Sequence, residues 1–246
     1  MSTDTSVSDS EGREPPRLGA LLLDIFASPR GAFAALAVRP VVLWPLLAIA
    51  VGNALVVFLY YLEVDFVWFL EATIEATGQQ PPPELSRAGA RMEAMRVVTG
   101  VMAGIGAAVT VLVIMLLVAG YFRLVSSITG DGIPYKRWLA LASWSSVPTL
   151  LDVLASVVNL ALADFSHRWP TEISVLSFGS LLGVDPAATG FLENLTRQTS
   201  IMSLWSLVLM VVGYKTWTGK STATSTAIVA GPLLVIVGLG IAAAVL

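Results

Sequence analysis

The carboxyl group of Asp152 lies well inside an apolar stretch of the sequence that runs from Trp138 to Leu162. It follows Trp138 by 14 residues, which corresponds to about 21 Å along an α-helix. An acidic residue at such depth in a membrane helix indicates a proton relay or a cation ligand. There are two alternatives: the residue lies near the outer membrane interface, or it is neutral and hydrogen-bonded to a neighbouring helix.

Two amide side chains accompany this carboxyl group. Asn159 follows Asp152 by seven residues, which places both on one helical face, and Asn53 lies in another apolar stretch. Pro148, one turn before Asp152, frees a backbone carbonyl group and favours a kink with a polar pocket. The three polar side chains therefore form a candidate network between two helices. The alternative, which we favour, is a packing role, in which such hydrogen bonds contribute about 0.6 kcal/mol each.

Catalytic chemistry has little support in the sequence. The chain has no cysteine and a single histidine, His167, so neither a thiol nucleophile nor a zinc site of the HExxH kind is available. No GxSxG motif occurs, and no histidine lies in an apolar stretch, as a serine intramembrane protease would need. The sequence therefore predicts a protein that is not an enzyme and that holds no metal and no cofactor.

The composition is typical of an integral membrane protein. Of the 246 residues, 56% are hydrophobic and only 13% are charged, whereas a soluble domain has roughly 25% charged residues. The net charge of -3 argues against a nucleic-acid partner, which requires a basic surface. We expect an all-α fold with five membrane-spanning helices, because five segments reach the roughly 17–25 apolar residues that a span needs. These segments are 40–62, 97–122, 138–162, 201–217 and 226–246.

Lysine and arginine residues determine the expected orientation. Nine of them lie on the side of the N-terminus and five on the other side, so the positive-inside rule places the N-terminus in the cytoplasm and the C-terminus outside. Arg87, Arg91 and Arg96, at the outer start of the second span, are the main evidence against this orientation. The polar segment 1–17 is predicted to be a disordered tail, and residues 18–246 are predicted to form one membrane domain.

Two short helices are expected before the first span. Pro29 suits the first position of a helix, and Pro40 ends that helix because proline disfavours helical geometry in the preceding residue, Arg39. We expect these helices to lie flat on the cytoplasmic membrane surface, with Arg30 and Arg39 among the lipid phosphates. The alternative is that residues 18–39 extend the first span into the cytoplasm, with kinks at the prolines.

A tight turn precedes the third span. Two glycines and a proline fall within the sequence GDGIPYKRW, residues 130–138. Gly132, Tyr135, Lys136 and Arg137 make this turn a candidate docking site for a cytoplasmic partner or an acidic lipid headgroup. The alternative is that its basic residues act only as a topology signal.

Two stretches of the sequence resemble the Yip family, the Ypt/Rab-interacting membrane proteins, in the form of its bacterial members. They are SPRGAFAALAVRPVVLWP, residues 28–45, and GDGIPYKRWLALASWSSVP, residues 130–148. The residues that carry the resemblance are Pro29, Phe33, Leu36, Pro40, Trp44 and Pro45 in the first stretch, and Gly132, Tyr135, Arg137, Ala140, Leu141, Ser146, Val147 and Pro148 in the second.

The resemblance implies a five-span protein with a cytoplasmic N-terminus and a very short outer C-terminus. Eukaryotic members of the family bind prenylated Rab GTPases in vesicle traffic, whereas bacterial members have no such partner. We therefore expect a non-catalytic scaffold or adaptor in a bacterial inner membrane. Its expected partners are membrane lipids and other membrane proteins, or a second copy in a homo-oligomer. The alternative is a small transporter or channel that uses Asp152, Asn159 and Asn53.

Overall fold

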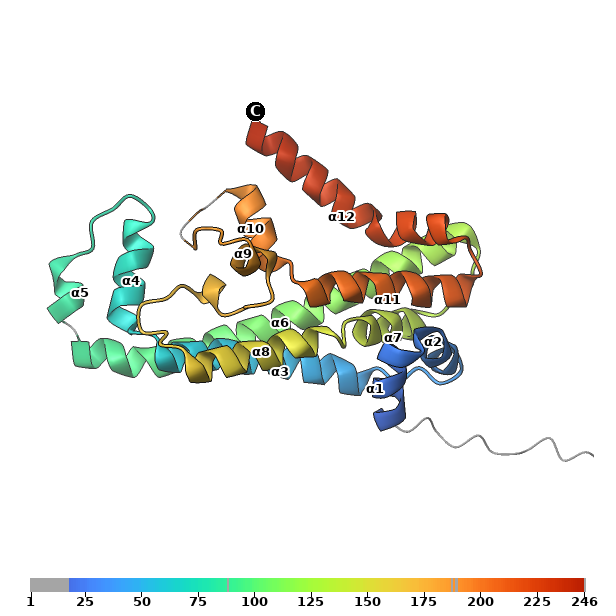
Figure 1. Ribbon diagram of the computed structural model, residues 1–246, viewed down its shortest axis with the longest axis horizontal. Helices are drawn as coiled ribbons and strands as arrows, with labels where there is room; N and C mark the ends of the chain where they lie inside the picture. Colours follow the sequence, from blue (N-terminus) through green and yellow to red (C-terminus); the bar gives the residue numbers. More distant parts are fainter. Residues whose placement is uncertain (1–17, 88, 187, 189, 246) are drawn as a thin grey trace, which may run out of the picture.

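The protein is a bundle of helices, shown as a computed structural model in Figure 1. The structure describes residues 18–87, 89–186, 188 and 190–245, so the predicted tail 1–17 lies outside the described residues. The helices are α1 (Leu18–Ala27), α2 (Pro29–Val38), α3 (Leu43–Glu63), α4 (Phe66–Glu75), α5 (Pro83–Arg87), α6 (Gly89–Thr129), α7 (Tyr135–Ser145), α8 (Thr149–Leu162), the 3-10 helix η1 (Pro170–Glu172), α9 (Phe178–Leu181), α10 (Phe191–Gln198), α11 (Ile201–Thr218) and α12 (Thr222–Val245). The described part of the chain contains no β-strand, which confirms the predicted all-α fold.

Four of these helices, α3, α6, α11 and α12, are long and apolar enough to cross a membrane. The helices α7 and α8 meet the same criterion together and form a fifth candidate span, bent by 40° at the break between them. The break falls at residues 146–148, where the sequence predicts a kink because Pro148 lacks the amide hydrogen that continues a helix. The protein is thus an integral membrane protein with four or five candidate spans.

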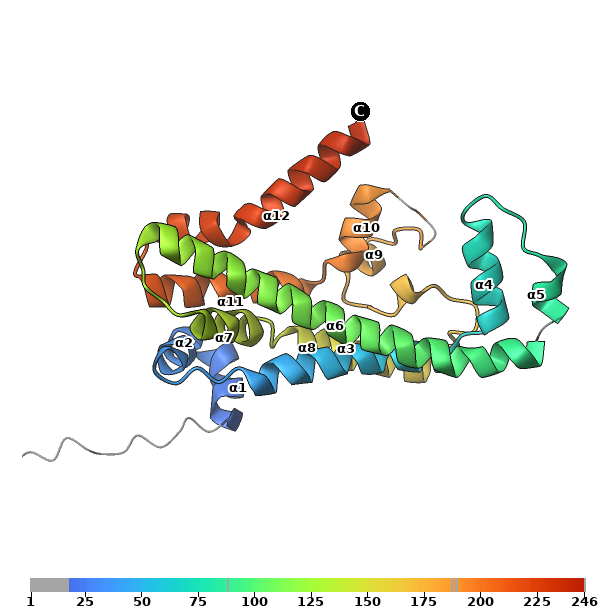
Figure 2. The same cartoon turned by 180° about the vertical axis from the view of Figure 1, so that it is seen from behind.

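Helices α3, α6, α8 and α11 lie along one axis, and α1, α2 and α4 lie across it (Figure 1). In Figures 1 and 2, α3, α6 and α8 run side by side along the long axis of the molecule. The helices α1 and α2 lie across one end of this bundle, here named the α2 end, and α4 and α5 lie at the opposite end, named the α4 end. Helix α6 has 41 residues, or about 61 Å of length at the usual helical rise, and it runs between the two ends.

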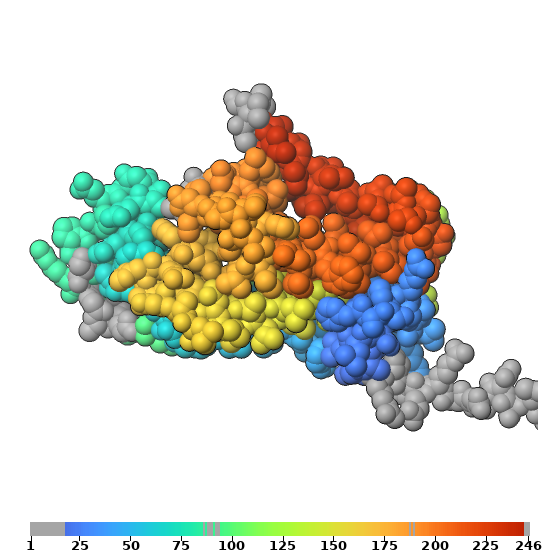
Figure 3. Space-filling model, viewed as in Figure 1, coloured from blue at the N-terminus to red at the C-terminus, as the bar shows by residue number. Residues whose placement is uncertain are grey.

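The remaining side of the bundle is formed by α11, α12 and the link between α8 and α11, residues 163–200. Helix α11 begins near the middle of the bundle and runs beside α7 to the α2 end. Helix α12 contains Pro232, and it runs first along α11 and then leaves the bundle (Figure 1). The 163–200 link folds back over α8, and Figure 3 shows it in yellow and orange on the surface of the spans.

Small residues allow the close contact between α3 and α6. A Cβ atom at Gly104 would lie 2.9 Å from the backbone oxygen of Ala54, and one at Gly100 would lie 2.8 Å from the Cβ atom of Tyr61. Glycines at four-residue spacing in α6 therefore let this helix approach α3 of the same chain closely.

Candidate functional site

The two stretches 28–45 and 130–148 fold against each other at the α2 end. Buried residues of both stretches belong to one hydrophobic core, together with residues of α6 and α11. The core includes Phe33 and Leu36 of α2, Ala140 and Leu141 of α7, Val147, Phe122 of α6, and Leu209 and Tyr214 of α11. Segments that are about a hundred residues apart in sequence therefore form one packed unit.

Two tryptophan side chains hold α2 and the segment that follows it against the bundle. Trp217, near the end of α11, donates a hydrogen bond from Nε1 to the carbonyl oxygen of Phe33 over 2.7 Å. Trp144 of α7 donates from Nε1 to the carbonyl oxygen of Val41, also over 2.7 Å. The side chain of Phe33 is fully buried. The apolar face of α2 thus packs on α7 and α11 of the protein.

The two arginines predicted before the first span lie on the exposed surface of this packed unit. Pro29 is at the first position of α2, directly after Ser28 as the N-cap residue, and Arg39 is the C-cap residue. Both Arg30 and Arg39 are exposed. Their guanidinium groups are thus accessible to lipid headgroups or to a partner protein.

Four aromatic rings fill the core against which α2 packs. The indole of Trp138 stacks on Phe122 and on Tyr214, with ring centroids 5.4 Å and 5.5 Å apart. The ring of Trp217 lies 5.8 Å from Trp138. Trp138 is fully buried, and its indole N–H has no hydrogen-bond partner among the described residues. This stack joins α6, α7 and α11 at the α2 end.

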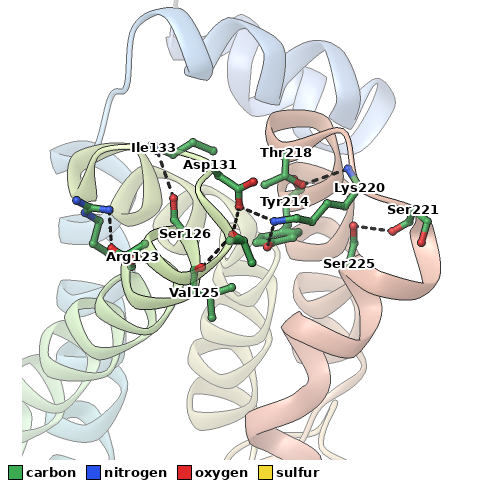
Figure 4. A network of polar contacts seen from close by, with 12 residues as sticks. Arg123, Val125, Ser126, Asp131, Ile133, Tyr214, Thr218, Lys220, Ser221 and Ser225 are labelled. Atoms are coloured by element: carbon green, nitrogen blue, oxygen red, sulfur yellow. Dashed lines mark hydrogen bonds and ion pairs between the residues drawn. The ribbon is translucent and has the colours of Figure 1, made fainter.

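The turn 130–134, between α6 and α7, is closed by an ion pair that Figure 4 shows from close by. Gly132 has a φ of 66°, which glycine adopts without steric strain. The Oδ2 atom of Asp131 lies 2.5 Å from Nζ of Lys220, which belongs to the turn between α11 and α12. Lys220 also donates to the hydroxyl oxygen of Tyr214 over 3.3 Å. The ion pair therefore fastens the two turns to each other.

The other predicted residues of this turn differ in their surroundings. The hydroxyl group of Tyr135 donates to the carbonyl oxygen of Leu116 over 3.0 Å, which attaches the start of α7 to α6. Lys136 is exposed and Arg137 is half-buried. Lys136 therefore carries the more accessible of the two charges.

The charges of the ion pair perturb each other. Burial alone would raise the pKa of Asp131, but hydrogen bonds from Lys220 and Thr129 and the charge of Lys220 outweigh it and lower this pKa below the usual 3.8. Burial alone would lower the pKa of Lys220, but its bonds to Asp131 and Tyr214 raise it above the usual 10.5. The pair is thus fully charged across the neutral pH range.

We expect Lys220→Met to lower the free energy of unfolding by about 1–3 kcal/mol at pH 7, because it leaves a half-buried carboxylate without its cation. The contribution of the pair in the unsubstituted chain should be lost as the pH falls below 3.8 and through the lowered pKa of Asp131, and again as the pH rises above 10.5 and through the raised pKa of Lys220. Thermal unfolding of the detergent-solubilised chain across this pH range measures both effects. Lys136→Met is the matched control, and an equal loss in both variants would contradict the prediction.

A second candidate site is a cavity of about 660 Å³ beside the break between α7 and α8. Its walls come from α3, α6, α8, the start of α11 and the 163–200 link. Its polar lining residues are Asn53, Ser146, Thr149, Asp152, Ser156, Ser174, Arg197, Gln198, Ser200 and Ser203. Residues of the 163–200 link that lie outside its helices, such as Ile173 and Ser174, also line this cavity.

The carboxylate of Asp152 is bound at the N-terminus of α11. The hydroxyl group of Ser200 donates to Oδ2 of Asp152 over 2.6 Å and accepts from the backbone N–H of Ser203 over 3.0 Å. Because Ser200 is the N-cap residue of α11, the carboxylate faces the positive end of this helix. The other carboxylate oxygen, Oδ1, is buried and has no hydrogen-bond partner in the described part of the chain.

The two asparagines bind other groups. Asn53 donates to a carbonyl oxygen of its own helix over 2.8 Å and lines the same cavity as Asp152. Asn159 donates to the carbonyl oxygens of Glu172 and Ile173 over 3.2 Å and 3.0 Å. It lines a neighbouring cavity of about 440 Å³. The structure thus places Asn53 and Asp152 at one cavity and Asn159 at the next.

Several residues of these two sites were not predicted from the sequence. A serine with another serine three residues later, just before an apolar run, is a helix-start pattern that identifies Ser200. Nothing local pairs Ser200 with Asp152, which lies 48 residues earlier. Arg197 was counted only as one of the five basic residues on the outer side, and Lys220 only as one of the nine on the other side. Asp131 lies within the predicted turn 130–138, but no role was predicted for it.

A family model described as the Yip1 domain matches residues 23–244 of the chain. The match therefore includes both candidate sites and all of the candidate spans. No curated protein and no solved structure matches the chain.

Proposed function

The chain belongs to the Yip1-domain family, and we propose that it is a non-catalytic adaptor of a bacterial inner membrane. It binds membrane lipids and other membrane proteins, or a second copy of itself, through its α2 end. The absence of cysteine and the single histidine in the sequence support a role without catalysis.

The α2 end lies in the cytoplasm in this proposal. Exposed basic residues gather there, namely Arg30, Arg39, Arg123 and Lys136. Positive residues are retained on the cytoplasmic side of membranes, and each contributes about 1 kcal/mol of attraction to an anionic lipid surface. With five spans, the C-terminus of the chain then lies outside.

The observation that carries the adaptor proposal is the packing of 28–45 against 130–148. Two indole hydrogen bonds and the Asp131–Lys220 ion pair hold these segments in place. A preformed surface loses little conformational entropy when a partner binds, which favours affinity. The exposed charge of Lys136 on this surface favours an acidic face on the partner.

The test is quantitative mass spectrometry of proteins that copurify from the native membrane in mild detergent. The double variant Lys136→Gln and Arg137→Gln should lose at least one reproducible partner by about tenfold, since each tenfold step corresponds to 1.4 kcal/mol. Arg168→Gln, which neutralises an exposed charge on the 163–200 link, is the matched control. If the double variant keeps every partner, the adaptor proposal fails.

The cavity beside the broken span favours a second candidate function, a path for a small cation or a proton. A broken helix and the N-terminus of a second helix meet at Asp152, and such an arrangement forms binding sites in transporters. Asp152 and Asn53 would then contact the transported species. Five spans do not divide into two equal halves, so an inverted-repeat transporter would require a dimer.

Proteoliposomes with a pH-sensitive dye inside test this second function. Asp152→Asn should abolish proton or proton-coupled flux while leaving folded protein in the membrane. Asp164→Asn, an exposed carboxylate just beyond α8, should leave the flux unchanged. Unchanged flux in Asp152→Asn would rule this function out.

A further inference from the structure

The cavity at Asp152 combines a polar wall with an apolar wall. The apolar wall consists of side chains from α3 and α6, among them Val56, Val57, Val111 and Ile114. Ile114 is 53% exposed, so this wall continues to the outer surface of α6. In a membrane span such a surface faces lipid, and the cavity is therefore accessible to a molecule that arrives from the bilayer.

Asp152 and Arg197 both line this cavity, and each has one buried polar atom without a hydrogen-bond partner in the described part of the chain. One is the acceptor Oδ1 of Asp152, and the other is the donor Nε of Arg197. Each unsatisfied buried group costs about 1–3 kcal/mol, and more when it is charged. A ligand that satisfies both atoms therefore gains binding free energy from each.

The guanidinium group of Arg197 is held in place and has one N–H left. Nη1 donates to the carbonyl oxygens of Asp185 and Pro186 over 2.7 Å and 2.9 Å, and Nη2 donates to the carbonyl oxygen of Ala188 and to Oδ1 of Asn194. A guanidinium group has five N–H bonds, so these four contacts leave only the Nε–H group. Arg197 precedes Ser200 by three residues, and Ser200 is bonded to Asp152. The unsatisfied donor and acceptor thus belong to two residues that line one cavity.

We propose that this cavity binds the headgroup of an aminophospholipid, with its primary ammonium group at Asp152 and its phosphodiester at Arg197. The ammonium group supplies the N–H donor and the positive charge that Oδ1 of Asp152 lacks. The phosphodiester supplies the acceptor for Nε of Arg197. The acyl chains lie along the apolar wall of α3 and α6. A choline headgroup has no N–H to donate, and a glycerol headgroup has no cation, so both bind less tightly.

This site is the cavity of the second candidate function, and the inference names its occupant. It requires the cavity but no flux, and it is independent of the adaptor proposal at the α2 end. Lipid binding without flux would support the headgroup site and contradict the transport function. Flux without selective lipid binding would support the transport function and contradict the headgroup site.

Native mass spectrometry of the delipidated full-length chain tests the proposal. The chain is presented with phosphatidylethanolamine, phosphatidylcholine and phosphatidylglycerol of identical acyl chains. Phosphatidylethanolamine should bind at least about tenfold more tightly than the other two, as one charge-assisted hydrogen bond predicts. Asp152→Asn, which removes the charge and keeps the size, should abolish this preference, and Asp164→Asn should keep it.

A second variant and a second ligand complete the test. Val57→Trp fills space at the apolar wall, removes no polar group and should weaken binding of all three lipids. Free ethanolamine should bind far more weakly than the lipid, because it lacks the phosphodiester and the acyl chains. Equal binding of the three lipids, an unchanged preference in Asp152→Asn, or equal affinity for free ethanolamine would each overturn the proposal.

Discussion

Replacing Trp138 with alanine should lower the free energy of unfolding by about 3–5 kcal/mol. The indole is fully buried and stacks on Phe122 and Tyr214, so its removal leaves a cavity where α6, α7 and α11 meet. The core at the α2 end cannot collapse onto this space, because α2 is held across it by the indole of Trp217. Thermal unfolding in detergent measures the loss. Hydrogen exchange in residues 29–38 should rise at the same time.

Two phenylalanine variants separate packing from hydrogen bonding in this core. Trp138→Phe removes an indole N–H that has no partner in the described structure, whereas Trp217→Phe removes one that binds the carbonyl oxygen of Phe33. Trp217→Phe should therefore cost about 1 kcal/mol more than Trp138→Phe. If the two variants are equally stable, the indole bond does not hold α2. A loss below about 0.5 kcal/mol in Trp138→Ala would contradict the packing argument itself.

Local sequence patterns predicted the helices before the first span but not the surface that buries them. The prolines at 29 and 40 mark a helix boundary through their own backbone geometry, which needs no distant information. The partner of α2 is different, because Trp217 lies 184 residues from Phe33 in the chain. An apolar helix face looks the same in sequence whether lipid or protein covers it. The all-α fold and the kink at Pro148 were predictable because they also depend on local sequence. The fold follows from apolar segments long enough for a span, and the kink follows from the backbone geometry of proline.

The polar cavity illustrates the same limit. A carboxyl group in an apolar stretch is rare, so the sequence alone is enough to identify Asp152 as a candidate. Its partner Ser200 lies in a link with an ordinary composition, and only the return of that link to the middle of the bundle brings the two together. Asn159 shares a helix face with Asp152, but its amide group binds backbone carbonyl groups of the link. Side-chain spacing on one helix predicts a shared face and not a shared partner.

Arg197→Leu should disorder the 163–200 link and lower its local stability by about 3 kcal/mol or more. The guanidinium group donates to three backbone carbonyl groups and to Asn194, and several of these acceptors would lose a charged donor in a part of the fold with little other regular structure. Limited proteolysis and hydrogen exchange of residues 173–200 measure this loss. The exchange of residues 29–38 at the α2 end should stay unchanged, because α2 packs on α7 and α11.

Two further substitutions decide whether the geometry of Arg197 or only its charge matters. Arg197→Lys keeps the charge but has three donors on one atom instead of a planar fork, so it should protect the link only in part. Gly179→Ala would place a Cβ atom 2.9 Å from Cα of Arg197, and it should loosen the same link although it removes no polar group.

The control for the loss of a charge on the link is Arg168→Leu. The guanidinium group of Arg168 lies 5.4 Å from the Phe165 ring. If Arg168→Leu and Arg197→Leu raise proteolysis equally, charge alone explains the effect. If only the substitutions at Arg197 and Gly179 do so, the link is ordered by the arginine fork, and this fork also places Nε of Arg197 at the proposed headgroup site.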